Sequence, residues 1–460
     1  MGPGDGIVVS VLQSYFVETW GCQMNELDSR YLEGILQARG LCPAADAGAA
    51  EAEVVLLNTC AVREKAVHKV LSRLGELERS RHATGKPALV GLCGCVAEQD
   101  GARLLARSRV LGFVLGPGRI GQLGAALDAA AAGERVSALG FTGGRDWDSA
   151  TIARGGRARQ LVTVVHGCNQ HCTFCVVPYT RGHEENRRLV DIINEINNLT
   201  KSHAHEITLL GQTVNAYRCP STGADFADLL EAVCAIEGPW RVQFLTSHPK
   251  YFTDKLIRTI AELPRLGRYL HVPFQAGSDA VLRRMHRGYT RGEYLDMAAR
   301  LRAARPDITL STDVIVGFPG ETESDFEQTL ELVAELHFGQ LFGFVFSPRP
   351  RTPAARYPDR VTPEVASERI ARLFALQTEI QLALNQGLIG RHVEVLVDGP
   401  AKRGAGIWSG RGDDNRVVNF PAWDGIREGE LVTVEIAGAS AHALFGERRQ
   451  PTAAVPAPAA

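Results

Sequence analysis

Three cysteines stand within the stretch "GCNQHCTFC", at Cys168, Cys172 and Cys175. Thiolate sulfur binds both iron and zinc, so this spacing indicates a metal site. A four-iron cube has four corners, and three cysteines would leave one iron open to a substrate or cofactor. A zinc site would instead need a fourth ligand, which His166 or His171 could supply. The spacing by itself leaves both alternatives open.

Three other cysteines each close a predicted strand. Cys22 ends "YFVETWGC", Cys60 ends "EVVLLNTC" and Cys95 ends "PALVGLCGC", and a helical pattern follows each of them. Repeated strand–helix units predict an open parallel sheet with helical crossovers. The loops after the carboxyl ends of parallel strands meet at one edge of the sheet, where ligands bind. We therefore expect these cysteines to converge, although buried cysteines at strand ends would give the same pattern.

The fold class expected from these patterns is α/β, with a separate C-terminal barrel. Residues 13–130 carry the open parallel α/β pattern, and residues 131–157, rich in Gly, Ala and Arg, resemble a linker. Residues 158–385 alternate six candidate strands with helical patterns, which predicts a partial (β/α)6 barrel with ligands at the carboxyl strand ends. The candidate strands are "QLVTVVHG", "EITLLGQ", "RVQFLT", "RYLHVPFQ", "ITLSTDVIVG" and "LFGFVFS".

The C-terminal region has a different pattern. Residues 387–446 contain short β-branched runs between Gly and Asp turns, which predict a small antiparallel β-barrel of the oligonucleotide-binding kind. Residues 447–460 are rich in Pro and Ala, which favours a disordered tail.

Composition sets limits on location and partners. The chain has 460 residues, 45% of them hydrophobic, and a formal net charge of -2. This balance gives no bulk attraction to nucleic acid, so an RNA partner would need a local basic patch. No apolar run approaches the roughly 18 residues of a membrane span, and the first residues lack signal-peptide features. We therefore expect no membrane association and a cytoplasmic location, where cysteines serve as metal ligands more often than as disulfides.

Longer motifs resemble a known family. The CxxxCxxC spacing, with Phe174 before its last cysteine, is similar to the signature of radical S-adenosylmethionine (SAM) enzymes. The stretch "NRVVNF" and its flanking strands resemble a TRAM domain, an RNA-binding barrel. Together, residues 13 to 446 resemble the methylthiotransferase family of radical SAM enzymes. The other motifs that carry this resemblance are "ETWGCQMNELDS", "NTCAVRE", "GCVAEQ", "GCNQHCTFCVVPYTRG", "TLLGQTVNAY", "TSHPK", "HVPFQAGSDAVLRRMHRGYTR", "STDVIVGFPGETESDF" and "FSPRPRTPAA".

The resemblance implies two [4Fe-4S] clusters and SAM. The cysteines of the first set hold the cluster whose open iron binds SAM, and they are the expected catalytic residues. Those of the second set hold an auxiliary cluster that can carry sulfide. Cys93 competes with Cys95 as a ligand, but the family pattern Gly-Cys-x-Ala fits "GCVA" at Cys95. The expected ligands are Cys168, Cys172 and Cys175 for the first cluster and Cys22, Cys60 and Cys95 for the second; the expected SAM contacts are Phe174, Gly211, Gln212, Val316 and Gly317.

The residues next to Cys22 and Cys60 resemble those of a subgroup of the family, and this resemblance implies the substrate. "GCQMN" and "TCAVRE" resemble bacterial enzymes that methylthiolate carbon 2 of N(6)-isopentenyladenosine at tRNA position 37. The hydrogen on that carbon is not acidic, so a general base fits poorly and a radical fits well. Two SAM molecules are then used, one as methyl donor and one as radical source. The alternatives are a threonylcarbamoyl-adenosine or ribosomal-protein substrate, or a zinc-stabilised RNA-binding protein without catalysis.

Several partners follow from this expectation. They are the tRNA anticodon stem-loop that bears isopentenyladenosine and an electron donor such as flavodoxin or ferredoxin, with the enzyme itself a monomer. Basic side chains of the C-terminal half could pair with RNA phosphates. The candidates are Arg349, Arg351, Lys402, Arg403, Arg411 and Arg416.

Overall fold

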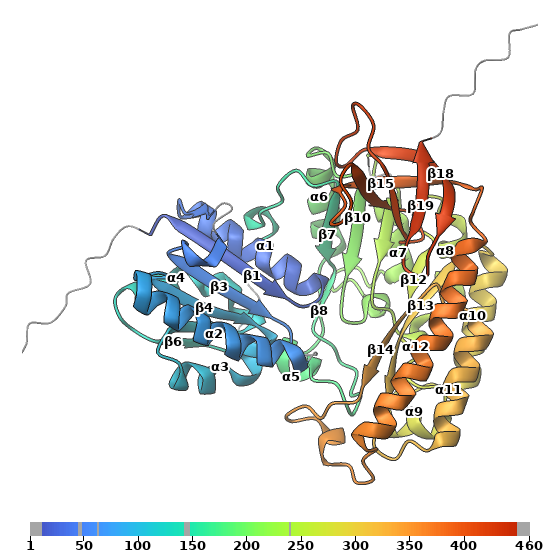
Figure 1. The fold of residues 1–460 in the computed structure, drawn as a ribbon, viewed down its shortest axis with the longest axis horizontal. Coiled ribbons are helices and arrows are strands. Elements are labelled where there is room, and N and C mark those ends of the chain that lie inside the picture. The colour runs from blue at the N-terminus through green and yellow to red at the C-terminus, as the bar shows by residue number, and fades with distance from the viewer. Residues whose placement is uncertain (1–11, 45–47, 62–63, 142–147, 239–240, 449–460) are drawn as a thin grey trace, which may run out of the picture.

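Three parts follow one another along the chain: an α/β domain, a partial barrel and a small closed β-barrel (Figure 1). The computed structural model describes residues 12–44, 48–61, 64–141, 148–238 and 241–448. The α/β domain lies beside the partial barrel, and the small β-barrel sits at one end of it (Figure 1). This arrangement confirms the predicted fold class.

The N-terminal domain is built on a parallel sheet of six strands, in the order β2-β1-β3-β4-β5-β6. The three strands predicted from sequence form its centre, and β2, β5 and β6 were not predicted. The strands are β1 (Ser14–Trp20), β2 (Cys42–Pro43), β3 (Val54–Thr59), β4 (Leu89–Gly94), β5 (Leu111–Leu115) and β6 (Val136–Ala138); the helices are α1 (Gln23–Ala38), α2 (Glu64–Thr84), α3 (Cys95–Arg107) and α4 (Leu123–Ala131).

Helices cover both faces of this sheet, which is why β3 is buried along its whole length. Val54 and Leu56 point into one core, shared with α1 and α4. Val55 and Leu57 point into the other core, shared with α2 and α3. Alternate residues of one strand therefore stabilise opposite layers.

The segment expected to be a linker differs from the prediction. β6 lies inside residues 131–157, and its three residues pair in parallel with Phe113–Leu115 of β5. A strand of three residues is too short to show an alternating pattern in the sequence. The predicted disordered tail also begins too early, because Glu447 and Arg448 belong to the last strand of the small barrel. Residues 449–460 lie outside the described residues.

All six strands predicted for the central region are confirmed. They form two three-stranded parallel sheets, β11-β10-β7 and β12-β13-β14. The two sheets meet where Gly267 N donates to Val242 O at 2.8 Å and Ser247 N donates to His271 O at 3.1 Å. The strands are β7 (Arg159–Thr163), β10 (Glu206–Leu210), β11 (Arg241–Phe244), β12 (Tyr269–His271), β13 (Thr309–Val316) and β14 (Gln340–Val345); the short pair β8 (Val165–His166) and β9 (Glu185–Asn186) is antiparallel.

Helices cover the outer face of these strands (Figure 1). Thr290 and Thr322 begin two of them with capping boxes, in which each side chain accepts from the third helical N–H. No helix within the described ranges is long and apolar enough to cross a membrane. The helices of this part are α5 (Val177–Arg181), α6 (Leu189–Thr200), α7 (Phe226–Cys234), α8 (Asp254–Glu262), α9 (Asp279–Met285), α10 (Arg291–Ala304), α11 (Glu323–Leu336) and α12 (Pro363–Gln386).

The C-terminal part is a closed barrel in the order β15-β16-β17-β19-β18. Its interior is apolar and includes Val395, Phe420 and Ile436. The predicted pairing is antiparallel, and the structure differs at one place, because β17 and β19 pair in parallel to close the barrel. The strands are β15 (His392–Pro400), β16 (Ile407–Arg411), β17 (Val417–Pro421), β18 (Leu431–Ala439) and the unpredicted β19 (Leu444–Arg448).

Ion pairs fix the small barrel to the amino ends of the partial-barrel strands. Arg268, just before β12, forms a two-pronged pair with Asp413. Arg159, at the start of β7, pairs with Asp398 at 2.5 Å. The carboxyl ends of the same strands are therefore left for other contacts.

We expect Asp413→Asn to lower the free energy of unfolding by about 1 kcal/mol, because it removes a charge-assisted pair that is only partly exposed. Urea unfolding of the full chain measures the change. Asp424→Asn, at an exposed position of the same barrel, is the control and should change stability by less than about 0.5 kcal/mol. Equal effects of the two substitutions would contradict the assigned contact.

Candidate functional site

The first cysteine loop follows β8, at the carboxyl end of the first barrel strand. The backbone N–H of Cys168 donates to Gly182 O at 3.2 Å, and that of Cys175 donates to Cys172 O at 3.0 Å. Thr173 N donates to Met285 O at 3.0 Å, which ties the middle of the loop to the end of α9. The three cysteines are thus held on a loop that is anchored from two sides.

The loop can begin only with glycine. Gly167 has φ of +68°, and a Cβ at this position would lie 2.0 Å from the carbonyl oxygen of His183. A side chain would therefore push the loop away from the segment that follows α5, and Cys168 is the next residue.

The thiols of the loop lie in buried surroundings that also hold a cation, Arg287. Burial raises the pKa of the Cys168 thiol. Burial, followed by the neighbouring Cys172, raises the pKa of Cys175 to about 12. Arg287, itself buried, donates to the Cys172 sulfur at 3.3 Å. Thiols in such surroundings become thiolates when a metal compensates the charge, so these residues fit an iron–sulfur cluster.

The residues expected to contact SAM surround this loop. Phe174 meets Phe318 edge-on, with ring centroids 6.5 Å apart. Gly211, after β10, lies in tight packing, since a Cβ would lie 3.1 Å from both Val165 Cβ and Val214 Cα. Each of these positions lies at the carboxyl end of a barrel strand or in the loop itself.

Polar atoms at the ends of two neighbouring strands lack partners. Within the described part of the chain, Gln212 Oε1 after β10 is buried without a hydrogen bond, as are Ser247 Oγ and His248 Nε2 after β11. Burying such atoms is costly unless a ligand satisfies them. They therefore fit a polar cofactor bound beside the cysteine loop.

His248 is a site residue to which the sequence assigned no role. Burial, with help from Arg287 and Lys250, lowers its pKa to about 3, so the imidazole is neutral at pH 7. Its Nδ1 accepts from Lys250 N at 3.3 Å, which leaves the proton on Nε2 as a donor. Thr213, whose Oγ1 is 3.4 Å from the Cys168 sulfur, was also missed. "TSHPK" and "TLLGQTVNAY" contain these residues, but nothing in either motif indicates which side chains face the cysteines.

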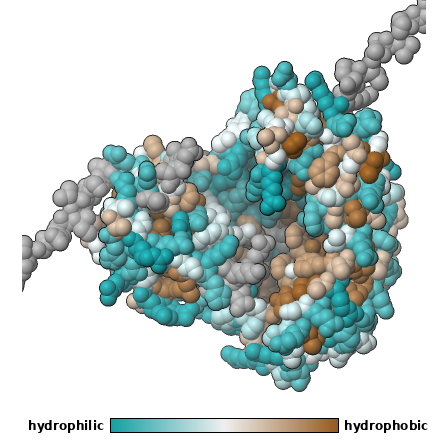
Figure 2. Space-filling model, viewed as in Figure 1, coloured by the Kyte–Doolittle hydropathy of each residue, from teal (hydrophilic) through white to brown (hydrophobic). Residues whose placement is uncertain are grey.

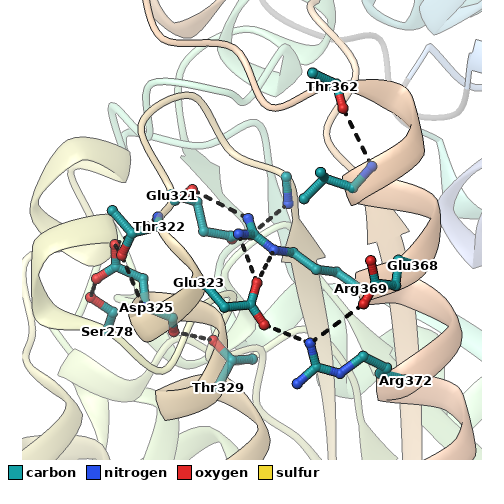
Figure 3. Close-up of polar contacts among 12 residues, drawn as sticks. Ser278, Glu321, Thr322, Glu323, Asp325, Thr329, Thr362, Glu368, Arg369 and Arg372 are labelled. Carbon is teal, nitrogen blue, oxygen red and sulfur yellow. Dashed lines mark hydrogen bonds and ion pairs between the residues drawn. The ribbon is translucent and has the colours of Figure 1, made fainter.

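Val316 ends β13 and Gly317 begins the turn after it, and Figure 3 shows the contacts beside this turn. Gly317 N donates to Glu321 Oε1 at 2.9 Å, and Arg369 of α12 donates to the same oxygen at 2.7 Å. Burial raises the pKa of Glu321. Arg369 thus holds the turn after β13 against α12, and the Gly317 N–H is already used by the protein.

We expect Arg369→Met to lower the free energy of unfolding by about 3–5 kcal/mol, because it leaves the buried Glu321 carboxylate without its charge partner. Arg372→Met is the matched control on the next turn of α12 (Figure 3). The Arg372 side chain is 35% exposed and pairs with Glu323 and Glu327, so its loss should cost less than about 1 kcal/mol. Urea midpoints of both variants measure the difference, and similar values would refute the special role of Arg369.

The second set of cysteines lies on three adjacent strands of the N-terminal sheet. Cys22, Cys60 and Cys95 follow β1, β3 and β4. A hydrogen bond with Cys60, opposed by burial and helped by Arg181, lowers the pKa of Cys22 to about 5. Burial raises the pKa of Cys95, although Arg181 opposes this effect. The structure therefore brings the three sulfur atoms and one arginine together at the carboxyl edge of the sheet.

Cys93 points elsewhere. It is the fifth residue of β4 and packs in the core between the sheet and α1, with Leu27 and Phe113. Burial raises the pKa of its thiol well above the ordinary range. Cys95 begins α3 and packs on the opposite face. The placement favours Cys95 over Cys93 as the third ligand of this site.

The zinc alternative requires ligands around a single ion. Across residues 12–448, apart from the undescribed segments, no three His, Cys, Asp or Glu side chains gather tightly enough for one metal ion.

Gly94 shapes the auxiliary site. Its backbone, at φ 85° and ψ −159°, lies in a region that is essentially restricted to glycine. A Cβ there would lie 2.3 Å from Asn58 Oδ1 and 2.9 Å from Thr59 O. Any side chain would therefore displace Cys95 from the strand end.

We expect Gly94→Ala to lower the free energy of unfolding by about 3 kcal/mol and to reduce the iron bound after anaerobic reconstitution. Gly133→Ala is the matched control in the same domain, because Gly133 has φ of +87° with nothing within 4 Å of a built Cβ. It should cost about 1 kcal/mol of backbone strain and leave iron binding unchanged. Thermal unfolding and iron analysis compare the two variants.

The candidate RNA contacts divide into two groups. Arg351 is exposed in the loop after β14, where Arg349 is half-buried, and Lys402 and Arg403 are exposed between β15 and β16. The other two candidates make contacts within the protein. Arg411 donates to Asn415 O at 3.1 Å, and Arg416 pairs with Asp414 and with Asn385 Oδ1. Arg411 and Arg416 therefore stabilise the protein itself. The sequence did not separate these two arginines from the exposed ones, because it does not show which side chains are packed.

Comparisons with known proteins agree with this geometry. A model of the radical SAM superfamily matches residues 162–333, and a model described as uncharacterized protein family UPF0004 matches residues 14–116. A solved structure with a similar fold is a radical S-adenosylmethionine methyltransferase from Kitasatospora setae with cobalamin and a [4Fe-4S] cluster bound. The two chains share 15% identity with a TM-score of 0.54, over 87% of this chain and 77% of that one. The fold and the cysteine loop together define a radical SAM enzyme.

Similar proteins of known name show which family of radical SAM enzymes the chain belongs to. A tRNA-2-methylthio-N(6)-dimethylallyladenosine synthase from Geobacter metallireducens is 43% identical over 435 residues, which cover 94% of this chain and 97% of that protein. The corresponding protein from Nitrosomonas europaea is 41% identical over 440 residues, with 94% and 98% covered. The chain belongs to the family of tRNA-2-methylthio-N(6)-dimethylallyladenosine synthases.

Proposed function

We propose that this enzyme methylthiolates carbon 2 of N(6)-isopentenyladenosine at tRNA position 37. The observation that carries the proposal is the pair of three-cysteine sites on a chain that belongs to this family. One lies at the carboxyl edge of the N-terminal sheet and the other after the first strand of the partial barrel. A substrate carrying threonylcarbamoyl-adenosine or a ribosomal-protein side chain is the alternative within the same chemistry.

The cysteines divide into two ligand sets. Cys168, Cys172 and Cys175 hold the [4Fe-4S] cluster to which SAM binds, and Cys22, Cys60 and Cys95 hold the auxiliary one. When bound, these groups supply a radical that removes the carbon-2 hydrogen, a sulfur atom and, from a second SAM, a methyl group.

The protein's own residues position and shield these groups. Gln212, Ser247 and His248 present buried polar atoms toward the cofactor side of the strand ends. The neutral His248 donates from Nε2 and does not act as a base at pH 7. Arg287 donates to the Cys172 sulfur from a buried position. Water is thereby replaced by fixed polar groups around the first cysteine loop.

The wall formed by β12, β13 and β14 suits a prenylated base. Phe342 lies on the face of these strands away from the helices and is 37% exposed. Its ring meets the His271 ring edge-on, with ring centroids 5.9 Å apart. His271 Nε2 lies 3.5 Å from Asp313 Oδ2, so polar and apolar groups stand side by side. Figure 2 shows a hollow between the N-terminal domain and the barrel, with hydrophobic side chains on the barrel side. The exposed Phe342 supports an apolar substituent as the ligand.

The remaining partners complete the proposal. The anticodon stem-loop contacts the exposed Arg351, Lys402 and Arg403, since local basic groups must hold RNA on a chain of net charge -2. A small electron-transfer protein such as flavodoxin or ferredoxin delivers the electron. The enzyme acts as a monomer in the cytoplasm.

Deleting the gene and analysing tRNA nucleosides by mass spectrometry tests the substrate. Isopentenyladenosine should accumulate in place of its methylthio form, and the wild-type gene should restore the methylthio form. Unchanged nucleosides, or loss of a methylthio group from another nucleoside, would refute the assignment.

Cysteine variants test the division between the two sets. The reconstituted wild-type chain should bind about eight irons for two four-iron cubes. Cys168→Ala should abolish SAM cleavage, whereas Cys60→Ala should retain part of the SAM cleavage without inserting sulfur. Equal loss of SAM cleavage in both variants would contradict separate roles, and Cys42→Ala, at an exposed cysteine outside both sets, should resemble wild type.

A further inference from the structure

The short helix α5 joins the two cysteine sites. It begins two residues after Cys175 and ends at Arg181, between the α/β domain and the barrel (Figure 1). Val176, which directly follows the first cysteine set, is 3% exposed and packs in the same core as Cys95. Six residues of chain, 176–181, therefore lead from the first cysteine set to the boundary with the N-terminal domain.

The positively charged side chain of Arg181, at the end of α5, reaches into the N-terminal domain. Its guanidinium donates to Asp28 Oδ2 at 2.7 Å, and the two side chains are 3% and 1% exposed. Asp28 lies on α1, the helix that begins directly after Cys22. The pair is thus buried at the boundary of the two domains and next to the auxiliary cysteines.

The arginine lies where the elements that carry the auxiliary cysteines meet. Helix α5 packs against α3, whose first residue is Cys95, and Asp28 holds the guanidinium against α1, which begins directly after Cys22. In an ordinary buried ion pair, the carboxylate alone neutralises the guanidinium. Here the guanidinium pairs with one carboxylate and also lies near two expected cluster ligands.

We propose that Arg181 is a positioning residue for the auxiliary cluster, holding the Cys22 and Cys95 thiolates beside Asp28 and raising the reduction potential of that cluster. The inference rests on the cluster assignment of the proposed function. A cation buried in a medium of low dielectric constant favours the reduced state, which carries more negative charge. Because α5 belongs to the barrel, the auxiliary site is complete only when the two domains are in contact.

The test isolates the auxiliary cluster in the full-length chain. Cys168, Cys172 and Cys175 are replaced by Ala so that one cluster remains, and its midpoint potential is measured by a redox titration followed by electron paramagnetic resonance. Arg181→Met should lower the equilibrium constant for one-electron reduction about tenfold, which corresponds to about 59 mV. Arg181→Lys keeps the charge and should recover most of the potential.

Two further variants separate charge from stability. Arg241→Met removes an arginine that is also 3% exposed and pairs with Glu206, at the opposite end of the barrel strands. It should destabilise the chain to a similar extent without moving the potential. Asp28→Asn removes a negative charge, so it should raise the potential, and it keeps the test decisive if Arg181→Met does not fold.

The outcomes are distinguishable. Opposite shifts for Arg181→Met and Asp28→Asn, with none for Arg241→Met, support the proposal. An unchanged potential in folded Arg181→Met, or in Asp28→Asn, would reduce Arg181 to a structural ion pair and overturn it. A triple-alanine chain that binds no iron would instead refute the auxiliary cluster itself, together with this inference.

Discussion

The buried pair between Arg181 and Asp28 determines how the two cysteine sites stand relative to each other. Its partners lie in different domains, at the end of α5 and within α1, and almost no water reaches either side chain. Each charge is costly to bury alone, so the pair is favourable only while both domains keep their contact. The first cysteine loop and the auxiliary site are consequently held together across the domain boundary and are connected by a helix of five residues.

The two ends of the partial barrel have separate tasks. Parallel strands place all their following loops at one end, and both the cysteine loop and the unpartnered polar atoms lie there. The other end is occupied by the small barrel, fixed through Arg268 and Arg159. A substrate that contacts both the cysteine sites and the basic loops of the small barrel must extend along the molecule, which suits a stem-loop of RNA.

Most of the architecture could be predicted because the strands and helices differ in hydrophobic period. The central strands showed continuous apolar runs, and their order along the chain implied parallel pairing. β6 and β19 escaped prediction since the first is three residues long and the second ends in Glu447 and Arg448 beside the Pro/Ala-rich segment. The parallel closure of β17 on β19 is a tertiary pairing that no local pattern encodes.

The sequence by itself indicated two three-cysteine metal sites, because the spacing of the cysteines and the strand before each of them are local features. Its longer motifs, through their resemblance to a known family, indicated the radical chemistry. Only the tertiary structure decided which side chains serve that chemistry. Asp28 and Arg181 are 153 residues apart, so nothing local connects them. Arg416 looked equivalent to the exposed arginines, and only packing placed it against Asn385, 31 residues away. The sequence shows which residues are charged. Burial lowers the dielectric constant around a charge and so strengthens its interactions, and it arises only when distant segments pack together.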